Sequence, residues 1–295
     1  MRSVRCGLLA RNSAPGYGLL RVVTTGCVAV AGVILGLGMA SAAAEPHPVR
    51  ARLVGDAVRP AAAGTPHVGV LFEIEEGWHI YWKNPGDAGL ATEVRLTLPD
   101  GLEAAAPRWP APSRFTQPGG LAGYGYESSL LLASEVRPAG PPPAAGAPVA
   151  AEVSWLACKE VCLLGSARLE ERWPLPAAAT EFERWRAELP ATEPPFSVNL
   201  TGGWAPGARR AELTLWMTWP APPGEVELYP EAGGQLKLSA PRVQSRDAMT
   251  RVDLEATVVG GSSAPPERLT AVVTARAAGE ARRAWDIVIP LAAQP

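Results

Sequence analysis

Hydrophobic residues alternate with polar ones along much of this chain. In the stretch 67–74 the apolar residues fall on one side of an extended backbone: Val68, Val70, Phe72 and Ile74. The same period of two recurs in the stretches 94–98, 149–155, 213–219, 252–258 and 285–291. Alternation of this kind is typical of β-strands with one buried face, and Gly and Pro between the stretches supply turns. We therefore predict an all-β fold of the β-sandwich type.

One segment, residues 177–195, has a different period. Thr180 and Glu183 have the form of a capping box, which predicts that a helix begins there. The large apolar residues that follow recur at helical spacing and are succeeded by prolines: Phe182, Trp185 and Leu189, then Pro190, Pro194 and Pro195. The segment is therefore predicted to be a short helix between two runs of strands.

A short helix between two runs of strands is a natural place for a domain boundary. We predict two immunoglobulin-like β-sandwich domains, residues 45–176 and 196–295, joined by a helical linker at residues 177–195. The first domain contains the only two cysteines that follow residue 45, and the second contains no obviously reactive residue. Any chemistry is therefore expected in the first domain.

Residues 1–44 differ from the rest of the chain in charge and pattern. They contain four arginines and no acidic residue, followed by an uncharged apolar stretch from Val22 to Met39 and then small residues. This order is that of a secretory signal peptide. An uncleaved membrane anchor is the alternative, because the apolar stretch is almost long enough to cross a bilayer. We expect cleavage after residue 44 and export to an oxidising compartment.

Removal of residues 1–44 changes both the charge and the cysteine count. The net charge of −2 becomes −6 once the four arginines are gone. That acidic balance argues against nucleic acid or an anionic membrane as the main partner. Cys6 and Cys27 leave with the segment, so Cys158 and Cys162 are the one pair that remains. In an oxidising compartment a single pair indicates one disulfide.

The spacing of Cys158 and Cys162 restricts the local backbone. A fully extended chain would hold their Cα atoms about 13–14 Å apart, whereas a disulfide needs roughly 4.4–6.8 Å. Because a strand pattern leads up to Trp155 and apolar residues follow Cys162, we predict a hairpin tip. A ring this small constrains the unfolded chain little, and a bridge on a turn is open to attack by another thiolate. A structural bridge, a redox-active pair and a metal site all remain open.

A metal site has the least support in the sequence. A structural zinc ion needs four ligands, and the exported chain adds only three histidines at no recognised spacing: His47, His67 and His79. Two thiolates alone satisfy copper(I), provided that the pair stays reduced. We therefore expect no metal and no other cofactor, and keep a copper-binding protein of envelope stress as one alternative.

Four blocks of sequence resemble those of a known family. They are residues 78–89 (WHIYWKNPGDAG), 108–112 (RWPAP), 124–127 (YGYE) and 155–162 (WLACKEVC). In this order they resemble the periplasmic N-terminal domain of the thiol:disulfide interchange protein DsbD family, and more closely its suppressor-of-copper-sensitivity branch, ScsB. The resemblance covers about residues 45–175.

The resemblance implies a redox relay in the periplasm. In that family an immunoglobulin-like domain takes electrons from a membrane-embedded donor and passes them to periplasmic oxidoreductases or isomerases through its own cysteine pair. Carried over, it implies that Cys162 forms the mixed disulfide with a thioredoxin-like partner and that Cys158 resolves it. It further implies a loop at Gly119–Tyr126 that caps the sulfurs. The positions that would support the cysteines are His79, Tyr81, Tyr124, Tyr126 and Glu127.

The sequence thus favours a thiol–disulfide oxidoreductase whose electron donor is a separate membrane protein. The main alternative is a non-catalytic binding module of immunoglobulin type, in which the Cys158–Cys162 bridge only rigidifies a hairpin. One departure from the family concerns the hairpin itself, because Leu163 and Leu164 stand where a proline often follows the second cysteine.

Overall fold

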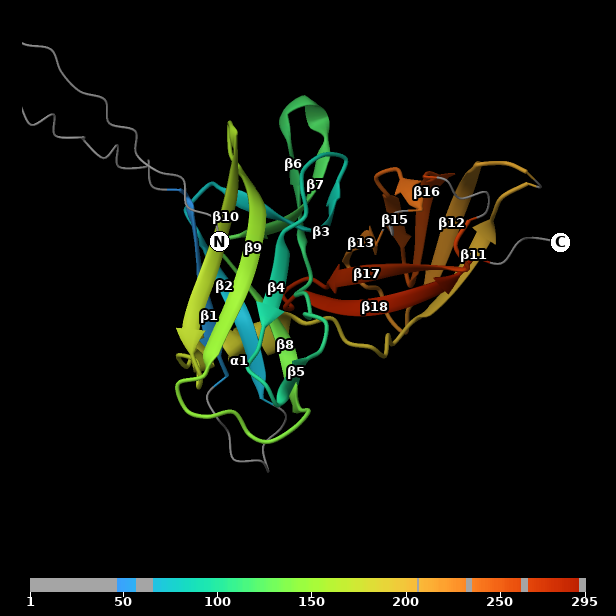
Figure 1. Ribbon diagram of the computed structural model, residues 1–295. Coiled ribbons are helices and arrows are strands. Elements are labelled where there is room, and N and C mark those ends of the chain that lie inside the picture. The colour runs from blue at the N-terminus through green and yellow to red at the C-terminus, as the bar shows by residue number, and fades with distance from the viewer. Residues whose placement is uncertain (1–46, 57–65, 206, 232–234, 261–264, 292–295) are drawn as a thin grey trace, which may run out of the picture. The chain divides into compact units, whose positions relative to one another are not determined.

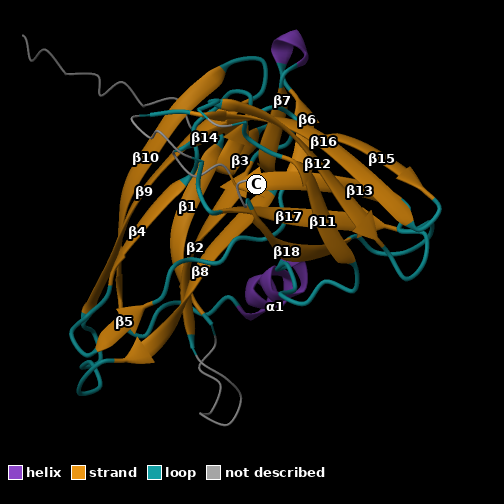
Figure 2. Cartoon of the chain, turned by 90° about the vertical axis from the view of Figure 1, so that its right-hand side faces the viewer, coloured by secondary structure: helices purple, strands orange, loops and turns teal. Residues whose placement is uncertain are grey.

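Strands make up most of the residues that the computed structural model describes, which are 47–56, 66–205, 207–231, 235–260 and 265–291 (Figures 1 and 2). All pairs of named strands are antiparallel. The all-β prediction is confirmed. The predicted signal peptide, residues 1–44, lies outside the described residues. Across the described ranges, no helix has both the length and the apolar character needed to cross a membrane.

Two sheets form the N-terminal sandwich. The first has the order β1-β2-β8-β5 and consists of β1 (Val49–Gly55), β2 (His67–Ile74), β8 (Ser129–Pro138) and β5 (Leu102–Ala104). The second has the order β10-β9-β3-β7-β6 and consists of β10 (Cys162–Arg172), β9 (Pro148–Cys158), β3 (His79–Gly86), β7 (Ala122–Glu127) and β6 (Ser113–Thr116). Strand β4 (Glu93–Thr97) also pairs with β9, and a short 3₁₀ turn, η2 (Pro118–Gly120), joins β6 to β7.

Two further sheets form the C-terminal sandwich. One has the order β11-β12-β16-β14, with β15 also on β16, and consists of β11 (Ser197–Gly202), β12 (Arg210–Thr218), β16 (Met249–Val258), β14 (Leu236–Leu238) and β15 (Arg242–Arg246). The other has the order β13-β17-β18 and consists of β13 (Glu225–Glu231), β17 (Arg268–Arg276) and β18 (Arg283–Pro290).

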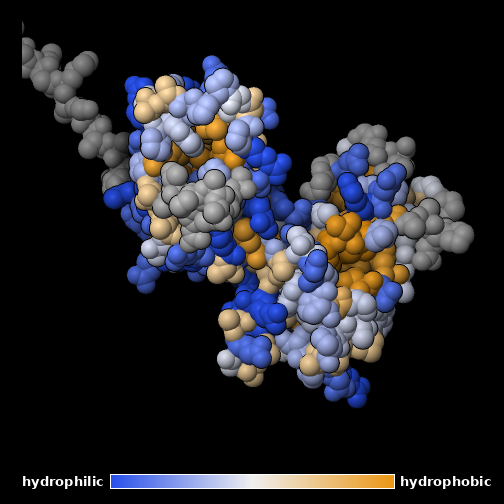
Figure 3. Space-filling view, turned by 90° about the horizontal axis from the view of Figure 1, so that it is seen from below, coloured by the Kyte–Doolittle hydropathy of each residue, from blue (hydrophilic) through white to orange (hydrophobic). Residues whose placement is uncertain are grey.

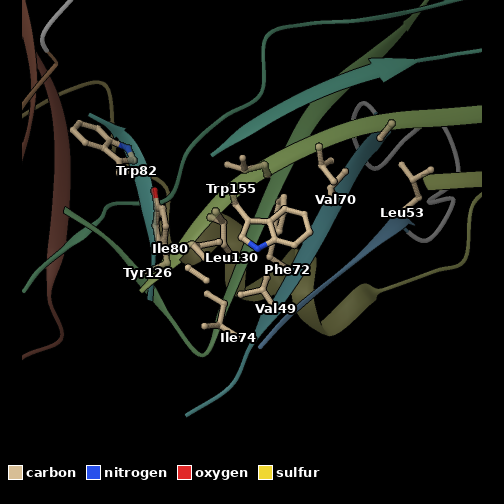
Figure 4. Close-up of a cluster of buried hydrophobic side chains, with 14 of the residues drawn as sticks. Val49, Leu53, Val70, Phe72, Ile74, Ile80, Trp82, Tyr126, Leu130 and Trp155 are labelled. Carbon is tan, nitrogen blue, oxygen red and sulfur yellow. The ribbon is translucent and has the colours of Figure 1, made fainter. Parts of the chain in front are cut away.

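The core of the N-terminal sandwich is built from the residues that the alternation selects. Every second residue of β2 from Val68 to Ile74 is buried, and so is every second residue of β9 from Val149 to Ala157. Trp155 of β9 meets Phe72 of β2 edge to face, with ring centroids 5.6 Å apart (Figure 4). Such pairs of large aromatic side chains contribute a large share of the buried apolar area.

The C-terminal sandwich has its own core, again at the predicted alternate positions. The side chains on one face of β12, β16 and β18 are buried in this core. It also includes a cluster of three aromatic rings: Phe196, Trp219 and Trp285. In the space-filling view, apolar side chains gather in patches with hydrophilic residues round them (Figure 3). Each sandwich therefore has a core of its own, and Tyr229 of β13 and Val272 of β17 also join the N-terminal core.

Some side chains of the C-terminal strands reach the N-terminal strands. Tyr229 of β13 packs against Trp82 of β3 and Tyr124 of β7, with ring centroids 6.4 and 5.2 Å apart. The Asn84 side-chain amide donates a hydrogen bond of 2.6 Å to the Pro230 carbonyl oxygen. By their contacts, the described residues between 47 and 291 form one compact unit.

The helix occurs where the sequence predicts it, but it begins and functions differently. Helix α1 (Ala179–Glu188) has Ala178 as its N-cap residue, with no side-chain hydrogen bond to the backbone there. The predicted capping box is therefore wrong, because Thr180 already lies inside the helix. Phe182 and Trp185 are buried against apolar residues of β1, β2 and β8. The helix thus packs on the outer face of the first sheet and is more than a linker.

Candidate redox site

The two cysteines form a disulfide at the tip of the β9–β10 hairpin. Cys158 is the last residue of β9 and Cys162 is the first of β10, and the two are paired directly across the ladder. Their Cα atoms are 4.1 Å apart and their sulfurs are bonded. The predicted hairpin tip is confirmed. The hairpin brings the sulfurs together because its register places these two positions opposite each other at the turn.

Exposure differs between the two cysteines. Cys158 is 3% exposed, whereas Cys162 is exposed. Val161, which precedes Cys162, and Leu164, two residues after it, are 61% and 73% exposed, which is unusual for such large apolar side chains. Only one of the two cysteines, with apolar neighbours, is therefore open to another molecule.

A row of four residues crosses the second sheet at the level of the disulfide. Cys162 pairs with Cys158, Cys158 pairs with His79 of β3, and His79 pairs with Glu127 of β7. Directly opposite residues of antiparallel strands point to the same face, with Cβ atoms about 4.5–5.5 Å apart. The neighbours Ile80 and Ala157 belong to the core, so the row lies on the outer face of the sheet.

An aromatic side chain from the β6–β7 hairpin covers part of this face. The Phe115 ring lies 3.9 Å from the His79 ring and 5.7 Å from the Tyr81 ring, measured between centroids. Phe115 pairs with Gly123 across the hairpin, and a Cβ atom at position 123 would overlap the Phe115 ring. Glycine at position 123 is therefore what lets the ring lie down over His79 and Tyr81.

Polar contacts hold the β6–β7 hairpin in this position. The Tyr81 hydroxyl donates a hydrogen bond of 2.9 Å to Oε1 of Gln117, and Nε2 of Gln117 donates one of 3.0 Å to the Ala88 carbonyl oxygen. The Ala122 amide donates to the Asp87 carboxylate at 2.8 Å. Together these bonds tie both sides of the hairpin to the segment that follows β3.

Burial sets the protonation of the covered groups. It lowers the pKa of His79, because an imidazolium is less stable away from water, and it raises the pKa of Tyr81. The Nε2 atom of His79 is buried and has no hydrogen-bond partner. At neutral pH the covered face therefore holds a neutral imidazole, next in line to Cys158, and a neutral phenol.

The structure places the two other tyrosines of the predicted site on the opposite face. Tyr124 and Tyr126 are buried in the core of the N-terminal sandwich, at alternate positions of β7. The Tyr126 hydroxyl donates a hydrogen bond of 2.8 Å to the Pro110 carbonyl oxygen, and its ring stacks on Trp109. Burial raises the pKa of Tyr124 to about 12. Cys158, Cys162, His79, Tyr81 and Glu127 share the outer face, whereas these two tyrosines pack the interior.

Two residues of this region did not stand out in the sequence: Phe115 and Gln117. Neither belongs to an alternating run or to a recognised motif. The signal that points to Phe115 is indirect, since glycine at position 123 leaves room above the sheet for a ring from the neighbouring strand. No group of three or more His, Cys, Asp or Glu side chains that could hold a metal ion occurs in the ranges that the structure describes.

Residues 52–173 match the family described as thiol:disulfide interchange protein DsbD, N-terminal. This match supports a domain of the DsbD N-terminal type in that part of the chain, and so confirms the resemblance drawn from the four sequence blocks. The match ends before helix α1 and the C-terminal sandwich.

A solved structure is similar over most of the chain. It is the crystal structure of the N-terminal periplasmic domain of ScsB from Proteus mirabilis, with a TM-score of 0.62 and 19% sequence identity. The similarity covers 84% of this chain and 95% of that one, and at this identity it shows the fold. A marsupial T cell receptor covers 81% of this chain, but its TM-score of 0.22 carries no argument. None of the curated proteins matches the chain.

Proposed function

We propose that this chain is an exported, periplasmic thiol–disulfide exchange protein that relays electrons through Cys158 and Cys162. The observation that carries the proposal is the disulfide at the hairpin tip, with one cysteine exposed and the other buried. Attack on a disulfide needs access to one sulfur, and resolution needs a second thiol close behind it. The hairpin supplies both, within a segment that matches the DsbD N-terminal family.

In this mechanism the reduced protein attacks first through Cys162. Its thiolate forms a bond to one sulfur of the partner disulfide, and the other partner sulfur leaves as a thiolate. Cys158 then attacks Cys162, which releases the partner as a dithiol and restores the Cys158–Cys162 disulfide. Two electrons pass from this protein to the partner, and a membrane-embedded donor reduces the pair again.

The partner is proposed to be a thioredoxin-like oxidoreductase or isomerase of the periplasm. The exposed side chains of Val161, Leu163 and Leu164 around Cys162 offer apolar surface to a protein partner. Such surface is typical of interaction sites when it is grouped in this way. The proposed domain division is residues 45–176 and 196–295, supported by a core cluster in each part, with helix α1 packed on the first.

Covalent trapping tests the proposal. The Cys158→Ser variant keeps the attacking Cys162 but loses the resolving thiol, so it should accumulate a mixed disulfide in periplasmic extract. Mass spectrometry should identify the trapped protein as one with a thioredoxin-type cysteine pair. Cys162→Ser is the matched control and should trap nothing.

If neither variant yields a mixed disulfide, the relay is refuted and the binding-module alternative gains support. If Cys162→Ser is the variant that traps a partner, the roles assigned to the two cysteines are reversed.

A further inference from the structure

The ladder places His79 directly opposite Cys158, on the side away from Cys162. The two residues are register partners in neighbouring strands and point to the same face, so their Cβ atoms lie about 4.5–5.5 Å apart. On its other side His79 pairs with Glu127, which is exposed. The imidazole therefore stands between the buried cysteine and the solvated edge of the row.

Cys158 needs a proton acceptor because it is buried. At 3% exposure its thiol has little contact with water, and burial disfavours the charged thiolate that must attack the mixed disulfide. A thiol in such a place reacts through an adjacent base, as in other nucleophile–base pairs. Cys162 has no such need, because it is exposed and loses its proton to solvent.

The imidazole is free to act as that acceptor. Its Nε2 atom is buried and makes no hydrogen bond to any residue that the structure describes, which leaves a nitrogen with no structural task. Phe115 of β6 lies over the ring and keeps water from it. An unpartnered polar atom in a buried position carries a free-energy penalty, and at His79 it leaves a ring nitrogen available beside Cys158.

The groups around His79 leave it neutral at neutral pH. Tyr81 on its own strand and Phe115 on β6 are uncharged neighbours, with ring centroids 5.4 and 3.9 Å away. Charged residues near the row include Glu127 on β7 and, at the hairpin tip, Glu160 and Lys159, whose Nζ lies 3.4 Å from the Glu76 carbonyl oxygen. Burial is the cause that lowers the pKa of His79. A neutral imidazole can accept a proton.

We propose that His79 is the proton acceptor for Cys158 when Cys158 resolves the mixed disulfide held on Cys162. The inference rests on the proposed function and deepens it. The proton moves from the Cys158 sulfur to Nε2 of His79, and the thiolate forms a bond to the Cys162 sulfur. The bond between Cys162 and the partner breaks, the partner sulfur leaves as a thiolate and takes a proton from solvent, and His79 then returns its own proton to solvent. In the reverse reaction His79 protonates Cys158 as it leaves.

A pH-jump experiment with a small disulfide tests this step without any protein partner. Reduced protein is loaded at Cys162 with one equivalent of 4,4′-dithiodipyridine in mild acid, where resolution is slow. A jump to higher pH starts the attack by Cys158, and released thiopyridone reports its rate. In the wild type the rate of release should rise with pH until the pH exceeds the lowered pKa of His79. It should then level off, because His79 is fully neutral above that pH.

The His79→Gln variant should release thiopyridone at least about tenfold more slowly at pH 7, since general-base catalysis contributes about 10²–10⁴-fold. Its rate should keep rising with pH instead of levelling off, so that the deficit shrinks in alkali. The loading step at Cys162 should be unchanged. A merely structural effect would slow release equally at every pH and would not remove the plateau.

His47→Gln is the matched control. His47 lies in the same sandwich, and its Nε2 is also buried without a partner, but it packs on Trp155 away from the cysteine row. This variant should keep the wild-type rate and plateau. A wild-type rate and pH profile in His79→Gln would overturn the inference while leaving the relay intact. A wild type that never releases thiopyridone after the jump would overturn both.

Discussion

The two sandwiches share one construction but differ in what lies on the outer faces of their central strands. In the C-terminal sandwich the outer face of β12 and β16 is solvated, with polar pairs across the strands. Thr214 donates a hydrogen bond of 2.6 Å to Asp253, and Arg251 lies over the Trp216 ring and contacts Asp253 at 3.0 Å. This is the ordinary arrangement of an antiparallel sheet with one wet face.

In the N-terminal sandwich the corresponding face of β3 is covered. His79 and Tyr81 stand at outward positions, yet Phe115 and the β6–β7 hairpin close over them. His79, a member of the row that begins at the exposed Cys162, lies under this cover. The alternation of strands thus builds both cores, and the proposed proton acceptor, His79, lies where an outward face is kept from water.

The largest expected effect concerns the helix that sets the N-terminal sandwich apart. Phe182→Ala should lower the free energy of unfolding by about 3–5 kcal/mol, because the ring is fully buried against the outer face of β1, β2 and β8. Urea unfolding followed by circular dichroism measures the loss. Phe72→Ala, in the core of the same sandwich, should cost a similar amount. A loss below about 1 kcal/mol for Phe182→Ala would mean that the helix is only a linker.

Removal of the cover should make the two outer faces more alike. Phe115→Ala admits water to His79, so the pKa of His79 should rise toward its ordinary value, as followed by NMR titration of the ring. In the wild type, burial favours the neutral form of His79 in the folded protein, so its pKa is lower there than in the unfolded chain. The free energy of unfolding should therefore fall as pH drops below the ordinary histidine pKa, and the variant should lose part of this dependence.

Trp216→Ala is the control for that experiment, because Trp216 stands on the outer face of the C-terminal sandwich. It should leave the titration of His79 unchanged. An unchanged titration in Phe115→Ala as well would contradict the assigned cover.

The smallest expected effect concerns the wet face. Asp253→Asn should lower the free energy of unfolding at pH 7 by no more than about 1 kcal/mol, since exposed polar pairs contribute little. The hydrogen bond from Thr214 is the main cause that lowers the pKa of Asp253. The stabilisation by ionised Asp253 is therefore fully present at a pH above the pKa that this carboxyl has in the unfolded chain. It is lost as the pH falls through the lowered pKa of Asp253 in the folded protein. Urea unfolding at pH 7 and in acid should thus show the variant and wild type converging in acid.

The sequence predicted the parts of the fold that depend on a periodic pattern. The buried faces of β2, β9, β12, β16 and β18 follow the alternation residue by residue. The hairpin tip followed from chain geometry, because the short spacing of Cys158 and Cys162 allows a disulfide only if the backbone turns back.

The parts that the sequence missed depend on tertiary contacts. Helix α1 begins at Ala179 because burial of Phe182 and Trp185 stabilises it, and this outweighs the local capping signal at Thr180. Phe115 meets His79 only after β6 and β7 have folded over β3, and no local pattern marks that contact. The cysteine count singled out Cys158 and Cys162 and the family resemblance added His79, but the register of the sheet is what orders them in a row.

The central claim is that the Cys158–Cys162 pair exchanges electrons, and its reduction potential tests that claim most directly. The mature protein is equilibrated in thiol buffers of graded potential, the free thiols are alkylated, and mass spectrometry counts them. The account predicts a value between about −180 and −270 mV, the range of known exchange proteins. A value below about −300 mV would mark a structural bridge and contradict the relay.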